Sequence, residues 1–218
     1  IVVLTVMNLR GVRESGRAFA IPVYCFMGAM GLLAVVGTVQ ALAGTLPLAE
    51  SAQFELVAEP GFEEGLVGLG GAMLLARAFS SGCAALTGVE AISNGVPAFR
   101  KPKSRNAATT LLLLGLISSA MIAMILYLAR QTGVHYAENP HLQMTHNGQA
   151  LPVDYSQHPV IGQIAAAVFQ DLRPMFYVVT AVTGLILVLA ANTAFNGFPV
   201  LGSILARDGL LPRQLHTR

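Results

Sequence analysis

The amino-acid sequence predicts an all-α membrane protein, and three observations lead to that fold class. Hydrophobic residues make up 54% of the 218 residues and charged residues only 11%, whereas a soluble domain carries about 25% charged residues. Several apolar segments reach the length of about 20 residues that a bilayer-crossing helix needs. The connecting segments alternate between basic and non-basic charge. The net charge of only +2 gives little support to nucleic-acid binding, which uses a strongly basic surface.

Four membrane spans are expected along the chain. Three of them, at about 19–43, 107–129 and 174–206, contain no charged residue. The fourth lies at about 71–99 and is interrupted by Arg77, Glu90 and several glycines. Residues 1–7 resemble the tail of an earlier span. The chain is therefore expected to be a single internal fragment of a longer transmembrane domain.

Loop charge predicts the orientation, because cytoplasmic loops carry an excess of Lys and Arg. The segments before residue 19 and between 100 and 105 are basic, as is the tail after residue 206. The segment at about 44–70 holds five glutamates and no Lys or Arg, and the segment at about 130–173 is long and mixed. We expect these last two to be the outer loops.

The long outer loop is expected to contain a short helix. In HPVIGQIAAAVFQDL, residues 158–172, apolar residues recur at the spacing of an amphipathic helix, either on the membrane surface or packed as a lid. Its four histidines, at 135, 141, 146 and 158, have no i,i+4 pair and no nearby cysteine. They are expected to be exposed loop residues rather than a metal site. Cys25 and Cys83 lie in apolar runs and are expected to be small core residues rather than a disulfide.

A polar stripe runs along the interrupted span. Its members are separated by steps of 3, 4, 3 and 4 residues and would share one helix face: Ser80, Cys83, Thr87, Glu90 and Asn94. Charge inside a bilayer is costly and usually faces a bundle interior or a water-filled cavity. The stripe is therefore expected to line a wet pathway.

Glycines suggest that this span is discontinuous. Gly88 directly follows Thr87, and glycine interruptions at mid-membrane indicate the broken helices of transporters. Such a break would gather hard oxygen donors, which suit a cation. They are the freed backbone carbonyls, the Thr87 hydroxyl and the Glu90 carboxylate. Thr87 lies ten residues beyond Arg77, about 15 Å along a helix. With Arg77 at the outer interface, Thr87 would lie near the midplane.

Structural roles for the same residues stay open. Glu90 could bond a neighbouring helix, Thr87 could bond back to the carbonyl four residues earlier, and Asn94 could cap a helix end. In the last span, ANTAFNGFP at 191–199 places Asn192 and Thr193 side by side. They are candidates either for bonding between helices or for contact with the substrate pathway.

Three motifs in this order resemble the amino acid–polyamine–cation (APC) superfamily, and within it the KimA-type potassium importers. NLRGVRESG is similar to the loop between helices four and five, and TGVEAISNGVPAFRKPKSRNA to helix six and the loop after it. ANTAFNGFPVLGSILARDGLLPRQ is similar to helix eight. The resemblance implies a LeuT-like inverted-repeat fold, of which this chain would hold the tail of helix four and helices five to eight.

The resemblance also implies a site. The helix-six threonine and glutamate of the KimA-type potassium pathway match Thr87 and Glu90, while helices one and three would supply the rest. Amino acid transporters of the superfamily place an aromatic gate six positions before that glutamate, where this chain has Ala84. Ala84 and the Thr87 hydroxyl both favour an inorganic cation over an amino acid.

The expected function is therefore a secondary active transporter of the cell membrane. It would import a monovalent cation, potassium with proton coupling, and it would carry K⁺ and H⁺ without a cofactor. The alternative is an amino acid or polyamine permease of the same superfamily. An enzyme is not favoured, because the expected spans hold no histidine and Glu90 is their only carboxylate. A homodimer of the full-length protein is a further expectation from the resemblance.

Overall fold

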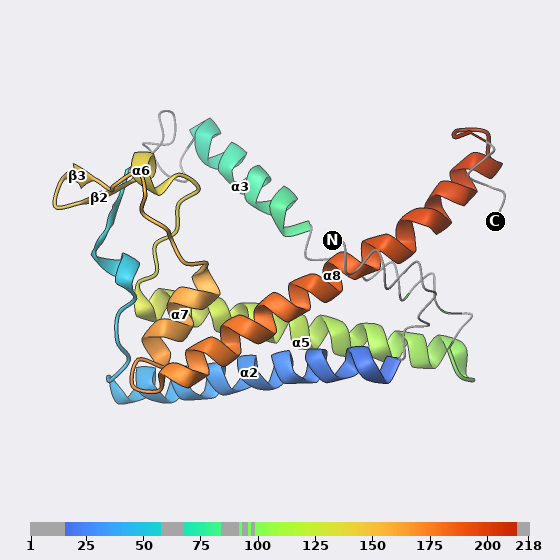
Figure 1. Cartoon of the computed structure of the whole chain (residues 1–218), viewed down its shortest axis with the longest axis horizontal. Helices are drawn as coiled ribbons and strands as arrows, with labels where there is room; N and C mark the ends of the chain where they lie inside the picture. The colour runs from blue at the N-terminus through green and yellow to red at the C-terminus, as the bar shows by residue number, and fades with distance from the viewer. Residues whose placement is uncertain (1–15, 58–67, 84–91, 93–95, 97–98, 213–218) are drawn as a thin grey trace. The chain divides into compact units, whose positions relative to one another are not determined.

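The computed structural model of the chain describes residues 16–57, 68–83, 92, 96 and 99–212, with the side chains at 16–19, 69, 192–201 and 204 outside the description. The chain divides into two compact units, residues 37–168 and residues 1–36 with 169–218. Four long helices are labelled in Figure 1: α2 (Gly16–Ala43), α3 (Gly68–Cys83), α5 (Lys103–Thr132) and α8 (Arg173–Arg207).

Short elements occupy the two expected outer loops. They are η1 (Glu50–Gln53), β1 (Glu55–Leu56), α6 (Pro140–Gln143), β2 (Met144–His146), β3 (Gln149–Ala150) and α7 (Val160–Val168). We call residues 44–57 together with 133–168 the outer segment.

Three of the described helices contain a stretch long and apolar enough to cross a membrane. These stretches are Ala20–Ala43, Lys103–Thr132 and Arg173–Ala191. The all-α membrane class expected from the sequence is confirmed. The expected span at 71–99 is described continuously only through Cys83, so the predicted break after Thr87 lies outside the described residues.

The carboxyl-terminal end of α2 packs closely against α5 and α7. A Cβ added to Gly37 would lie 2.8 Å from Leu128 Cδ2 and 3.1 Å from Val168 Cγ2. Nearby, the Gln40 amide donates to the carbonyl of Val168 at 3.1 Å. The absence of a side chain at Gly37 therefore lets a buried leucine of α5 and the end of α7 approach the α2 backbone.

The carboxyl ends of α2 and α5 lie at the same side of their unit. The Ala49 amide donates to the carbonyl of Thr132 at 2.8 Å, just after both helices have ended. The 30-residue α5 is about 45 Å long at 1.5 Å per residue. The described chain leaves the outer segment at Val57 and begins α5 at Lys103, at the opposite end of that helix, and the expected span at 71–99 lies between these two residues in sequence.

A left-handed residue ends α5 and starts the outer segment. Gly133 has φ 66°, a conformation that glycine adopts without the penalty of a Cβ. The Val134 amide then donates back to the carbonyl of Ala129 at 3.0 Å, as at many helix C-termini. The chain can therefore turn at once toward η1, where a Cβ on Gly133 would lie 3.2 Å from Ala52 Cβ.

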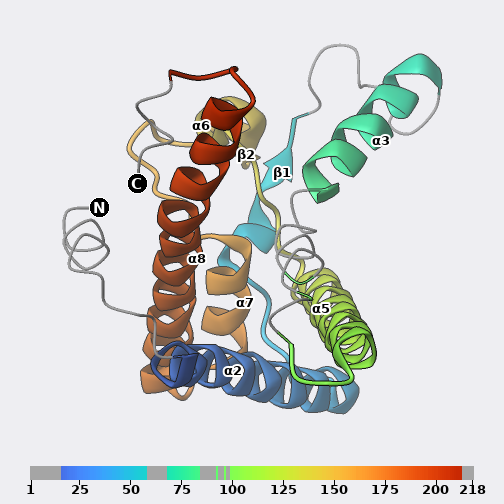
Figure 2. The same cartoon turned by 90° about the vertical axis from the view of Figure 1, so that its right-hand side faces the viewer.

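A small antiparallel sheet, which is not among the expected elements, joins the two expected outer loops. The strand order is β1-β2-β3, with Glu55 opposite Thr145 and His146 opposite Gln149. Figure 2 shows β1 and β2 side by side. Residues far apart in sequence are thus held together by backbone hydrogen bonds on the side predicted to be external.

The helix expected within residues 158–172 exists as α7 and is packed rather than lying free. Ile164 and Val168 are buried at 1% and 3% exposure, and α7 contacts both α5 and η1. Leu172, the last apolar residue of the expected stretch, lies beyond the helix end and is exposed. Of the two alternatives left open, the packed one agrees with the structure.

In the other unit, α8 is helical from Arg173 to Arg207 and includes Pro199. The hydroxyls of Thr180 and Thr183 donate hydrogen bonds to the carbonyls of Phe176 and Val179, four residues earlier. Its 35 residues measure about 52 Å, more than the roughly 30 Å of bilayer hydrocarbon. The helix therefore has length to tilt or to extend beyond the membrane.

Candidate functional site

The central residues of the predicted cation site, Thr87, Gly88, Glu90 and Asn94, lie outside the described residues. Their grouping stays a prediction. Asn192 and Thr193 lie on the helical backbone of α8, and their side chains are outside the description. The structure therefore describes the helix that leads to the predicted site along the chain, but not the site itself.

The described helix that precedes the predicted site is α3. Every residue from Ala72 to Cys83 is exposed, including Ser80 and Cys83 of the polar stripe. Cys83 is a free thiol, and so is the exposed Cys25 of α2. The expectation that both cysteines are core residues is wrong for the described chain, because neither lies where described elements pack together.

Arg77 ties α3 to the outer segment. Its Nη2 lies 3.6 Å from Oε2 of Glu138, and both side chains are largely exposed, at 70% and 79%. Glu138 belongs to the loop predicted to be external, so the contact agrees with Arg77 at the outer interface. The sequence predicts that position for Arg77 but carries no signal for its partner.

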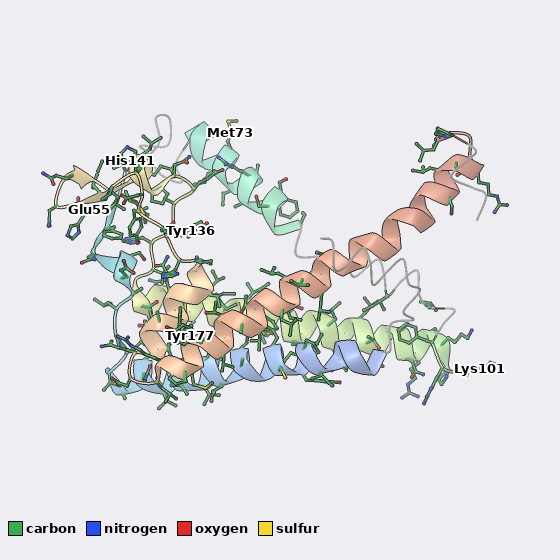
Figure 3. All side chains as sticks on the ribbon, viewed as in Figure 1. Glu55, Met73, Lys101, Tyr136, His141 and Tyr177 are labelled. Carbon is green, nitrogen blue, oxygen red and sulfur yellow. The ribbon has the colours of Figure 1, made fainter. Side chains whose placement is uncertain are left out.

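An open pocket lies beside this ion pair. Its volume is about 390 Å³, and it is lined by Leu74 and Arg77 of α3 and, from the outer segment, by Leu56, Val57, Tyr136, Ala137, Glu138 and Gln143. Figure 3 labels Tyr136 in the outer segment and Met73 on α3. The pocket is thus bordered by one charge of each sign and by several apolar side chains.

A buried polar network fixes α7 to the rest of the outer segment. Ser51 is fully buried, and Gln163 is 5% exposed. The Ser51 hydroxyl donates to Gln163 Oε1 and accepts the amide of His135 at 2.9 Å, while Gln163 Nε2 donates to the carbonyl of His158 at 2.8 Å. Every group named here has a partner, which is the condition for a buried polar network to stabilise a fold.

An apolar cluster holds the sheet to the loop that follows it. Its buried members are Phe54, Ala137, Met144 and Leu151, with Tyr155 packed against them. The Phe54 and Tyr155 rings meet edge to face with centroids 5.5 Å apart, a favourable aromatic geometry. Burial, and then the nearby Glu50 carboxylate with its hydrogen bond, raise the pKa of Tyr155 above its ordinary value of 10.0.

The loop histidines make more contacts within the protein than expected. His135 and His141 each place Nδ1 within hydrogen-bond distance of a backbone carbonyl, that of Phe54 at 2.7 Å and that of Leu151 at 2.5 Å. Because a carbonyl only accepts, both rings must carry their proton on Nδ1. His146 stacks edge to face on Phe54. Their exposure was therefore overestimated: His141 and His158 are exposed, whereas His135 and His146 are half-buried.

Among the described residues, no three His, Cys, Asp or Glu side chains lie close enough to hold a metal ion. The rings of His135 and His141 instead bind backbone carbonyls, and the ring of His146 packs against Phe54. These three contacts hold parts of the outer segment together.

The three apolar helices and the packing of α2 against α5 together define a multi-pass membrane protein. The family model for amino acid permeases matches residues 1–218. The chain is also 38% identical, over all 218 of its residues, to the potassium transporter KimA of Bacillus subtilis (strain 168). The aligned region is 32% of that protein, so the chain spans about one third of the length of this relative.

The chain belongs to the amino acid permease family. The resemblance to the APC superfamily and to KimA is thereby confirmed, as is a multi-pass location in the cell membrane. The bilayer is accordingly the medium that surrounds its apolar helices.

Proposed function

We propose that the protein containing this chain is a secondary active transporter that imports potassium with proton coupling. The observation that supports this most is the 38% identity, over the whole chain, to a potassium transporter. The oxygen donors predicted at Thr87 and Glu90 agree in chemistry, because carbonyl, hydroxyl and carboxylate oxygens are the ligands that hard cations take. We propose transport rather than catalysis.

In this proposal Thr87 and nearby backbone carbonyls coordinate the ion. Glu90 either supplies negative potential beside it or carries the coupled proton. Gly88 permits the local break in the helix, and Asn94, Asn192 and Thr193 line the pathway. The full-length protein is proposed to act as a homodimer, which light scattering after size-exclusion chromatography in detergent would test.

The second candidate is an amino acid or polyamine permease, and the observation that favours it is the family match itself. The two functions differ in cargo, so uptake by the full-length protein separates them. Expression in a strain deficient in potassium uptake should restore growth at low potassium. Uptake of labelled amino acids or polyamines without any potassium transport would support the alternative and contradict the potassium proposal.

Paired variants at Thr87 test whether its hydroxyl is a potassium ligand. Thr87→Val keeps the shape of the side chain and removes the hydroxyl, so it should weaken potassium uptake. Thr87→Ser keeps the hydroxyl and should retain more of it. Equal uptake by both variants would show that the hydroxyl is not a ligand.

A further inference from the structure

Four basic side chains lie where the chain enters α5. All four are exposed, and we call them the basic cluster: Arg100, Lys101, Lys103 and Arg105. In Figure 3, Lys101 is labelled at this end of α5, and further nitrogen-tipped side chains lie around it. The sequence contains no Asp or Glu between Glu90 and Glu138. Within the described residues, no carboxylate pairs with Arg100, Lys101 or Arg105. The cluster therefore presents three positive charges that no described carboxylate neutralises.

The length of the uncharged part of α5 places the cluster in the headgroup layer of the bilayer. Arg105 and Arg130 are the charged residues that flank this part, and they are 25 positions apart, which is about 37 Å along a helix. That distance exceeds the roughly 30 Å of bilayer hydrocarbon, but not the roughly 40–45 Å that includes the polar headgroups. A helix that centres its apolar part in the bilayer therefore holds Arg105 among the headgroups.

Hydrogen bonds hold the loop before α5 at the same depth. The Asn106 side chain donates through Nδ2 to the carbonyl of Arg100 at 2.8 Å, and the Asn106 amide donates to the carbonyl of Pro102 at 3.1 Å. These two bonds keep the preceding backbone against the first turn of the helix. The cationic side chains before Pro102 therefore stay at the level of Arg105 instead of extending away from the membrane.

We propose that the basic cluster is a binding site for the headgroup of an anionic phospholipid in the leaflet that surrounds the start of α5. Arg and Lys side chains at that depth meet phosphodiester oxygens, and an Arg guanidinium can bond two of them at once. A zwitterionic lipid offers the same phosphate, but the cluster repels its choline ammonium, so a net anionic headgroup is preferred. The inference goes beyond the proposed function, because it requires only a membrane-spanning α5 and no particular cargo.

Quenching of a fluorophore attached beside the basic cluster tests the site. In the full-length protein every native cysteine is replaced by serine, Ser104→Cys carries the fluorophore, and the protein is placed in phosphatidylcholine nanodiscs. A small fraction of the lipid carries a nitroxide quencher on its acyl chain and is either phosphatidylglycerol or phosphatidylcholine. At low salt, phosphatidylglycerol should be favoured by about fivefold or more, since each Lys or Arg near an anionic surface supplies about that factor. The preference should fall as salt screens the charges.

Variants separate the site from the effect of charge in general. Arg105→Gln should lower the preference by about twofold to fivefold. Arg130→Gln removes the same charge from the other end of the same helix and should leave the preference unchanged. Asn106→Ala keeps every charge but removes the bond to the carbonyl of Arg100, so it should also lower the preference. Joint replacement of Arg100, Lys101 and Arg105 by glutamine should bring the preference close to one.

Equal quenching by the two lipids in the parent protein would overturn the site, as would a preference that survives the joint replacement. An equal loss in Arg105→Gln and Arg130→Gln would also overturn it, since the net charge of the protein would then explain the effect. The third contrary result is displacement of the lipid by millimolar glycerol phosphate, beyond the effect of sodium chloride at the same ionic strength. It would assign the cluster to a soluble phosphate instead of a lipid.

Discussion

Replacement of Gln163 by leucine should loosen α7 because it breaks the buried network of the outer segment. Leucine is similar in size, but it can neither accept the Ser51 hydroxyl proton nor donate to the carbonyl of His158, two bonds that Gln163 makes in the structure. An unsatisfied buried group costs about 1–3 kcal/mol. With Ser51 fully buried, we expect a loss of about 2–3 kcal/mol in the local stability of α7.

Hydrogen–deuterium exchange of the α7 amides in the full-length protein measures this loss. Because 1.4 kcal/mol corresponds to a factor of ten, exchange should accelerate by roughly 30-fold to 100-fold. Gln170→Leu makes the same chemical change at an exposed position just beyond α7 and should leave the rates nearly unchanged.

A double-mutant cycle with Ser51→Ala separates the network from nonspecific damage. The two substitutions remove partners of one another, so their combined effect should be smaller than the sum of the single effects. Additive effects, or equal acceleration in Gln163→Leu and Gln170→Leu, would refute the claim that this network fixes α7.

Two further predictions concern the outer segment. Since the pKa of Tyr155 is raised, its protonated phenol stabilises the fold fully below pH 10.0, and this contribution is lost as pH rises from there through the folded pKa. Glu50→Gln should lower that pKa, as measured by phenolate absorbance with Tyr155→Phe as the blank, and an unchanged midpoint would exclude the Glu50 contribution. For orientation, Val153→Cys in the exposed outer segment should react with an external impermeant thiol reagent, whereas Ser104→Cys at the start of α5 should react only after permeabilisation. The reverse pattern would invert the topology.

The long helices could be predicted from sequence because their signal is local. An uncharged run of more than 20 apolar residues has few alternatives to a membrane-spanning helix, and α2, α5 and α8 cover the three runs identified that way. The spacing within residues 158–172 likewise indicated α7, since apolar residues at helical intervals need a partner surface.

The β2–β3 hairpin carried a local signal that was not used. Asn147 and Gly148 separate its strands and have φ 53° and 77°, and Asn-Gly is the preferred pair for such two-residue turns. The pairing of β1 with β2 had no comparable signal, because it joins residues about 90 positions apart and only the packed fold brings them together.

The Arg77–Glu138 contact and the Ser51–Gln163 network depend on the same long-range packing. Sequence can show that Gln163 is polar within an apolar helix, but not that a serine more than 100 residues away will satisfy it. The predicted cation site is a different case, because its signal is local in the sequence. Its spacing and oxygen chemistry are legible in the sequence, while the geometry that would test them lies outside the described residues.

Uptake by the full-length protein in proteoliposomes with an imposed pH gradient tests the central claim most directly, with Glu90→Gln compared against the parent and Glu90→Asp. If Glu90 takes part in cation and proton coupling, Glu90→Gln should show reduced potassium uptake or uptake that no longer responds to the gradient, while Glu90→Asp should retain a response. Potassium uptake by Glu90→Gln at the parental rate and with the parental pH dependence would contradict the account.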